Sequence, residues 1–129
     1  QSYDNVLLST KVIIEILDNV HFNKEVMLNA INNSYATATD IADWLVQNLD
    51  YTFRDAYYLT GKIVSYAEKK GKLLDKILIK EFQKFEKNIT KQIFKVLSPL
   101  NSMKSKSSFG GTSPESVKKS IQYAIKKYL

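Results

Sequence analysis

Residues 38–46 read ATDIADWLV and have the pattern of an amphipathic helix. Its apolar side chains recur at three- and four-residue spacing, the pattern of a helix that buries one face. That face comprises Ile41, Trp44, Leu45 and, just beyond the stretch, Leu49. Thr37 and Asp40 have the spacing of an acidic capping box, which predicts that the helix begins here.

The same pattern continues toward the C-terminus. Thr52 and Asp55 repeat the capping chemistry and predict a second helix, which should stop at Lys69-Lys70-Gly71, with the glycine at the C′ position. From residue 73 to residue 97 the apolar side chains again recur at helical spacing, and lysines occupy the opposite face. This pattern alone leaves open whether the segment is one helix or two.

Residues 98–112 are rich in serine and close with Gly110-Gly111, which predicts a loop. Ser113 followed by Pro114 then predicts the start of a last helix, because proline is favoured at its first position. Helical spacing gives that helix a core face, which comprises Val117, Ile121, Ala124, Ile125 and Leu129.

Toward the N-terminus, residues 3–20 predict a helix that carries two neighbouring apolar stripes. An apolar surface so wide suits a helix enclosed by others, in a larger bundle or an oligomer core. Phe22, Asn23 and Met27 have the spacing of a hydrophobic staple and predict that a shorter helix follows. No stretch alternates long enough to predict a half-buried strand, so the predicted class is all-α.

Composition limits the function classes. The chain has 129 residues, 44% of them hydrophobic, as expected for one globular domain. It lacks cysteine, which excludes disulfides, thiolate-ligated metals and a catalytic thiol. It begins with Gln1 rather than methionine and shows no signal peptide or membrane-spanning run, so we expect a piece of a longer protein.

Charge is distributed unevenly. Residues 1–61 carry three basic and eight acidic groups, whereas residues 62–129 carry sixteen lysines and five acids. Such asymmetry is one sign of an anionic partner. Eighteen of the nineteen cations are lysine, however, and arginine is the residue that makes bidentate phosphate and base contacts. We therefore favour a solvated basic face over a nucleic-acid interface.

Few residues suit catalysis. The single histidine, His21, lies at a predicted helix end, and no Gly-x-Ser-x-Gly elbow or phosphate-binding glycine loop is present. Asp40 and Asp43 could ligate a hard cation or share a proton, although acidic residues also simply favour a helix N-terminus. Residues 53–58, with Phe53, Arg54, Tyr57 and Tyr58, could form a stacking surface. We predict no catalytic, cofactor-binding or metal-binding residue.

Six blocks of this sequence, in order, resemble the C-terminal region of argininosuccinate lyases. ATDIADWLV at 38–46 is similar to ATDLADYLV, FRDA at 53–56 to FREA, and GKIV with AEKKG at 61–71 to GKLV with AEEKG. EFQKF at 81–85, VLSPLNS at 96–102 and GGTSPESV at 110–117 are similar to ELQ-x-F, VLSPxxS and GGTAPEAV. Two positions depart from the pattern: residues 48–54 are one residue longer without Gly or Pro, and Tyr57 replaces a histidine.

The resemblance implies an enzyme of the fumarase/aspartase superfamily, a cytoplasmic homotetramer built around a central helix bundle. It implies β-elimination of argininosuccinate to arginine and fumarate without a cofactor, in arginine biosynthesis. The catalytic serine loop and the acid/base histidine would lie outside this chain. Residues 1–34 would be the tail of the bundle domain, joining other subunits through residues 3–20. Residues 35–129 would be the small C-terminal helical domain, with two helices between 73 and 97 and a helix start near Ile79.

Two other classes stay open on the residues alone. A free-standing helical module could bind a partner bundle through its first helix. A basic protein could bind an anionic surface through the lysine-rich half, in which case binding would weaken steeply with salt.

Overall fold

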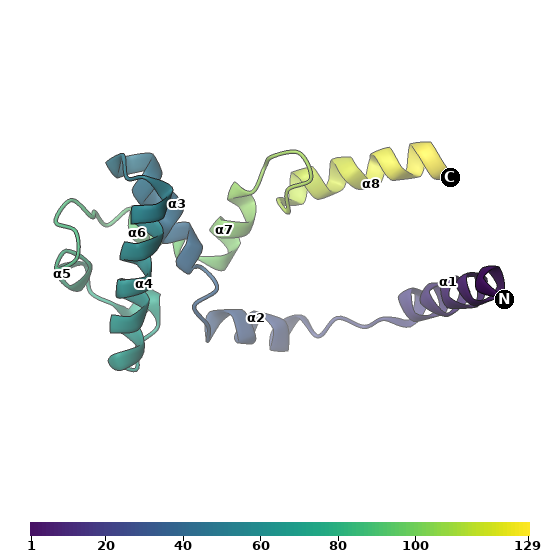
Figure 1. Ribbon diagram of the computed structural model, residues 1–129, viewed down its shortest axis with the longest axis horizontal. Helices are drawn as coiled ribbons and strands as arrows, with labels where there is room; N and C mark the ends of the chain where they lie inside the picture. Colours follow the sequence, from purple (N-terminus) through teal and green to yellow (C-terminus); the bar gives the residue numbers. More distant parts are fainter.

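Helices α3 (Ala38–Leu49) and α4 (Phe53–Lys69) form a hairpin around which the rest of the chain is arranged (Figure 1). The structure is a computed structural model that describes residues 1–129. Asp50 turns the chain between the two helices with a φ of 55°, a left-handed conformation that aspartate tolerates. The Thr52 hydroxyl then accepts a hydrogen bond from the Asp55 amide at 3.2 Å, which confirms the predicted cap of α4.

The end of α4 follows the prediction closely. Gly71 has a φ of 61°, its amide donates to the Glu68 carbonyl at 2.9 Å, and the Lys72 amide donates to the Ala67 carbonyl at 3.0 Å. This pair of bonds is a Schellman motif, which satisfies carbonyls that the helix end leaves free. A side chain at position 71 would be strained, so glycine fixes where α4 stops.

The core lies between α3, α4 and the segment that follows them. Every buried residue falls between Asp40 and Ser113, and the thirteen apolar ones form a single cluster. The face predicted for α3 is confirmed, since Ile41, Trp44 and Leu45 are buried and Leu49 packs against the cluster. The members of the cluster are Ile41, Ala42, Trp44, Leu45, Ala56, Ile63, Ala67, Leu74, Ile77, Phe82, Ile89, Ile93 and Leu97.

Residues 73–97 form no long helix, but the two helices that the resemblance implied are present, each only a single turn. The segment folds into a 3₁₀ turn, η1 (Leu74–Lys76), and two single-turn helices, α5 (Ile79–Phe82) and α6 (Ile93–Val96), joined by turns. The expected helix start at Ile79 is confirmed, but α5 ends within a turn. The apolar spacing that suggested a helix serves instead to bury Leu74, Ile77 and residues 82–97 at intervals against the hairpin.

Two tyrosine–glutamate pairs hold this irregular segment to the hairpin. The Tyr66 hydroxyl of α4 donates to Glu81 Oε1 at 2.8 Å, while the Leu78 amide donates to Glu81 Oε2 at 2.9 Å. The Tyr51 hydroxyl donates to the Glu86 carboxylate, which also accepts from the Asn88 amide at 2.9 Å. These bonds satisfy backbone donors that a regular helix would have satisfied internally.

The loop predicted over residues 98–112 is only partly correct. Pro99 opens a short helix, α7 (Pro99–Ser105), because its fixed φ suits a first helical position. The loop is therefore confined to residues 106–113. The last helix, α8 (Pro114–Tyr128), begins as predicted, with the Ser113 hydroxyl accepting from the Ser116 amide at 3.2 Å.

Helices α1 (Ser2–Asn19), α2 (Lys24–Asn32) and α8 extend from the same side of the hairpin body, and none of them buries a residue (Figure 1). The Asn23 cap is confirmed, since its side chain accepts from the Val26 amide at 3.1 Å. The core face predicted for α8 is wrong for this chain: Val117, Ile121 and Ile125 are exposed. No helix here is both long and apolar enough to cross a membrane.

We predict that Phe82→Ala destabilises the fold by about 3–5 kcal/mol, because Phe82 is fully buried and packs edge-on against Phe94. The centres of the two rings are 5.8 Å apart. The matched control is Phe109→Ala, since Phe109 is fully exposed, and it should change stability by less than about 0.5 kcal/mol. Urea unfolding followed by circular dichroism measures both. Equal effects of the two substitutions would contradict the placement of Phe82 in the core.

We predict a loss of stability in acid. The Leu78 amide and the Tyr66 hydroxyl lower the pKa of Glu81 from 4.5 to about 2, so its contribution is present above pH 4.5 and is lost as the pH falls toward 2. The urea midpoint should drop across this range. In Tyr66→Phe, which lacks the hydroxyl that is the second-largest of these causes, the pKa of Glu81 should rise and the drop should begin at higher pH. An unchanged acid profile in Tyr66→Phe would refute this.

Candidate functional site

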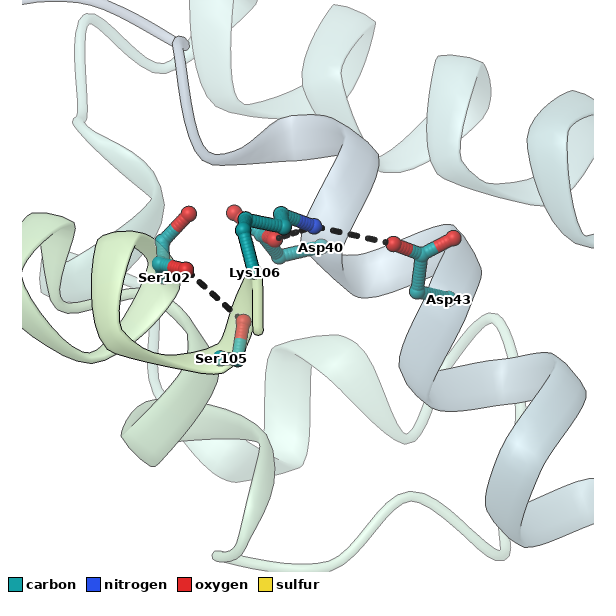
Figure 2. Close-up of polar contacts among 5 residues, drawn as sticks. All are labelled: Asp40, Asp43, Ser102, Ser105 and Lys106. Atoms are coloured by element: carbon teal, nitrogen blue, oxygen red, sulfur yellow. Dashed lines mark hydrogen bonds and ion pairs between the residues drawn. The ribbon is translucent and has the colours of Figure 1, made fainter. Parts of the chain in front are cut away.

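Lys106 joins two parts of the chain that are far apart in sequence. Its ammonium lies 2.9 Å from Asp40 Oδ1 and 3.2 Å from Asp43 Oδ2 (Figure 2). The two carboxylates stand one turn apart on α3, because a spacing of three brings side chains to the same helix face. Lys106 directly follows α7 and reaches across to both. We call this set of three residues the clamp.

The three residues of the clamp differ in their exposure to solvent. Asp40 is only 5% exposed, whereas the side chains of Asp43 and Lys106 are 43% and 42% exposed. Asp40 lies in the first turn of α3, where the helix dipole favours a negative charge. The hydrogen bond to Asp40 is the largest cause that raises the pKa of Lys106 above its usual value of 10.5, followed by that to Asp43. Lys106 is therefore a cation throughout the neutral range.

The backbone around Lys106 closes the loop that leads to α8. The Ser113 amide donates to the Lys106 carbonyl at 3.0 Å, and the Ser116 hydroxyl donates to the Ser107 carbonyl at 3.3 Å. Gly111 fits beneath this carbonyl only because it lacks a side chain, since a Cβ there would lie 2.2 Å from the Lys106 oxygen. The clamp and this closed neck together fix the base of α8 to α3.

An open cleft of about 750 Å³ lies beside the clamp. Its walls are mostly polar and come from α3, from the end of α6, and from α7 with the residues that follow it. The Ser105 hydroxyl is used internally, donating to the Ser102 carbonyl at 2.7 Å (Figure 2). The lining residues are Asp40, Asp43, Trp44, Gln47, Lys95, Val96, Asn101, Ser102, Ser105, Lys106, Ser107 and Ser108.

The chemistry of the cleft is that of ion pairing and hydrogen bonding. No hydroxyl in it lies against a histidine, and no three His, Cys, Asp or Glu side chains gather anywhere in the chain in a way that could hold a metal ion. The cation that lies between the Asp40 and Asp43 carboxylates is the Lys106 ammonium. The arrangement can position α3, α7 and α8 relative to one another.

Residues 35–104 match the family model described as "Argininosuccinate lyase C-terminal", which covers more than half of the chain and includes the whole hairpin. The chain belongs to the argininosuccinate lyase C-terminal family. Its relatives include the argininosuccinate lyases of Pelagibacter ubique, 44% identical over 91% of this chain, and of Ehrlichia ruminantium, 38% identical over 92%. The chain spans about a quarter of the length of the curated relatives it matches.

Solved structures of related lyases have the same fold. An EDDS lyase variant with bound fumarate matches 83% of this chain and 23% of its own, with a TM-score of 0.77 and 29% identity. EDDS lyase in complex with formate matches 82% of this chain and 23% of its own, with a TM-score of 0.76 and the same identity. The all-α class expected for the argininosuccinate lyase C-terminal family is thereby confirmed.

The structure revises the interpretation of Asp40 and Asp43 that the sequence favoured. Asp40 does lie in the first turn of α3, but the Thr37 side chain makes no capping bond, so the predicted capping box is wrong. The carboxylates converge as the cation-site alternative required, but on the Lys106 ammonium. Lys106 was missed, because nothing in the sequence distinguishes it from the neighbouring Lys104 as the partner of α3.

The other candidate residues from the sequence, His21 and the aromatic residues of 53–58, lie away from the clamp and from one another. His21 is exposed between α1 and α2. Tyr57 and Tyr58 are exposed on the outer face of α4, where the Lys62 ammonium lies 4.4 Å from the centre of the Tyr58 ring. A cation–π contact therefore exists on the predicted stacking surface, but its cation is Lys62 rather than Arg54.

We predict that Lys106→Met destabilises the protein by about 1–3 kcal/mol, because it leaves the carboxylate of Asp40 buried without its cation. Asp40→Asn in the same chain should recover most of that loss, since the buried charge is then removed as well. Asp43→Asn should cost less than Asp40→Asn, because Asp43 is more exposed. Urea unfolding of the wild type, Lys106→Met, Asp40→Asn and the double variant forms a double-mutant cycle. Additive effects of the Asp40 and Lys106 substitutions on the free energy of unfolding would contradict the clamp.

Proposed function

We propose that this chain is the C-terminal part of an argininosuccinate lyase, an enzyme that cleaves argininosuccinate to arginine and fumarate by β-elimination in arginine biosynthesis. The observation that carries the proposal is 44% identity over nearly the whole chain to the lyase of Pelagibacter ubique. The shared fold with an EDDS lyase variant that binds fumarate supports it. Such an enzyme works in the cytoplasm without a cofactor.

In this proposal the catalytic residues come from the rest of the enzyme, and residues 1–129 supply no catalytic, cofactor-binding or metal-binding side chain. Residues 1–34 are the tail of the central bundle domain, and residues 35–129 are the C-terminal helical domain. The position of every buried residue between Asp40 and Ser113 supports this division. The task of the C-terminal domain is structural, since its clamp and core give a fixed wall beside the cleft of the complete enzyme.

We further infer that residues 3–20 join other subunits of a homotetramer. Their apolar side chains are exposed along all of α1, and burying them would stabilise an assembly by roughly 25 cal/mol per Å² of apolar area. The small-molecule substrate is the other partner, and neither nucleic acid nor membrane is one. The excess of lysine over arginine supports the exclusion of nucleic acid, because lysine lacks the bidentate geometry of nucleic-acid contacts.

A free-standing interaction module is the second candidate function, and the exposed apolar face of α1 is the observation that favours it. It differs from the lyase proposal in one respect: a module needs no particular enzyme attached to it. Replacing the matching quarter of a working lyase with this chain therefore separates the two.

We predict that a chimera in which this chain replaces the matching C-terminal quarter of the Pelagibacter ubique lyase converts argininosuccinate to fumarate. The 129-residue chain alone and the shortened relative alone should both be inactive. Fumarate is measured by ultraviolet absorbance, and intact-mass spectrometry confirms that each sample contains one polypeptide. Turnover by the 129-residue chain alone would overturn the proposal, and a folded but inactive chimera would favour the interaction module.

A further inference from the structure

Each aspartate of the clamp uses only one of its two carboxylate oxygens within the chain. Lys106 donates to Asp40 Oδ1 at 2.9 Å and to Asp43 Oδ2 at 3.2 Å, and the second oxygen of each aspartate accepts no hydrogen bond from another residue. The Asp40 side chain is only 7% exposed. A carboxylate so deeply buried is costly unless further donors satisfy its remaining lone pairs. The clamp therefore offers two acceptor oxygens to a donor from outside the chain.

The cleft beside the clamp also offers free donors. A lysine ammonium has three N–H groups, and Lys106 uses two of them on the aspartates. Lys95 of α6 lines the same cleft and makes no ion pair. The Asn101 side-chain amide donates to the Lys95 carbonyl at 2.9 Å, which fixes the backbone of Lys95 beside α7. A carboxylate in the cleft can therefore accept from the third N–H of Lys106 and from Lys95.

The charges of the cleft lie side by side and balance. Its charged side chains are two carboxylates, Asp40 and Asp43, and two ammonium groups, Lys95 and Lys106. A purely anionic ligand would be repelled by the carboxylates, and a purely cationic ligand by the ammonium groups. A ligand whose ammonium and carboxylate are joined by one carbon atom places opposite charges next to each other, as the clamp itself does. That arrangement is the head group of a free α-amino acid.

We propose that the cleft beside the clamp binds a free α-amino acid with an uncharged polar side chain. The ligand ammonium donates to the open oxygens of Asp40 and Asp43, and the ligand carboxylate accepts from Lys106 and Lys95. The ligand side chain contacts polar walls, since only two of the twelve lining residues are hydrophobic. All of these residues lie between positions 40 and 108, so the site does not depend on what covers α1 or α8. It takes no part in the proposed lyase reaction and does not rest on it.

The test is a titration of the full chain with L-asparagine, followed by heteronuclear NMR of the backbone amides. We expect saturable shifts at residues 40–47 and 101–108, which form the walls of the cleft, and none on α1. N-acetyl-L-asparagine lacks the ammonium and L-asparagine methyl ester lacks the carboxylate, so each should bind about tenfold more weakly through the loss of a charged contact. Binding of either derivative as tightly as L-asparagine would overturn the proposal, as would the absence of a saturable shift.

Substitutions test the placement of the ligand. Asp43→Asn should weaken L-asparagine binding by about tenfold, because it removes a carboxylate that faces the ligand ammonium. The matched control is Asp50→Asn, since Asp50 lies outside the cleft and asparagine tolerates its left-handed conformation. Lys95→Met should also weaken binding, whereas Lys104→Met should not, because Lys104 does not line the cleft. Circular dichroism confirms that each variant is folded, and unchanged affinity in folded Asp43→Asn or Lys95→Met would overturn the proposal.

Discussion

The contact between Asp40 and Lys106 is the constraint on which the outer half of the structure depends. It is an ion pair across more than sixty residues of sequence, and its acidic member is buried. Burying a carboxylate costs free energy unless a cation and hydrogen bonds compensate for its lost hydration. Because Lys106 provides that cation from directly after α7, the position of α7 and the base of α8 follow from the position of α3.

The core shows how a small helical domain forms without long helices throughout. Of the helices that contribute buried residues to the core, only α3 and α4 are longer than a single turn, and residues 73–97 reach the core through turns. Such a segment leaves backbone donors free, and Glu81 and Glu86 accept two of them while also accepting tyrosine hydroxyls. The carboxylates therefore replace part of the hydrogen bonding that helix formation would otherwise have supplied, which makes this segment dependent on their ionisation.

Apart from the capping box at Thr37, the sequence predicted the helix ends that local chemistry determines. The caps at Asn23, Thr52 and Ser113 and the glycine stop at Gly71 each depend on a few neighbouring residues, and all are present. The shortness of the two helices in residues 73–97 did not follow from the pattern, because apolar spacing reports which residues are buried and not how the backbone between them runs. The role of Lys106 could not be predicted, because its partners are distant in sequence and many lysines have similar sequence neighbours. The face of α8 was predicted correctly as apolar but wrongly as core.

That last difference raises the question of what covers α8. A helix can have the sequence of a core helix and still be exposed when the surface that covers it belongs to another part of a larger protein or to another copy. Helices α1 and α8 both have this character, and they carry opposite charge, while the hairpin body between them encloses its own core. The clamp matters to this arrangement because an apolar helix gains most from a partner when its direction is already fixed, so that less conformational entropy is lost on contact. The constraints therefore act in series: the hairpin fixes Asp40, Asp40 fixes Lys106, and Lys106 fixes the base of α8, whose apolar face stays exposed.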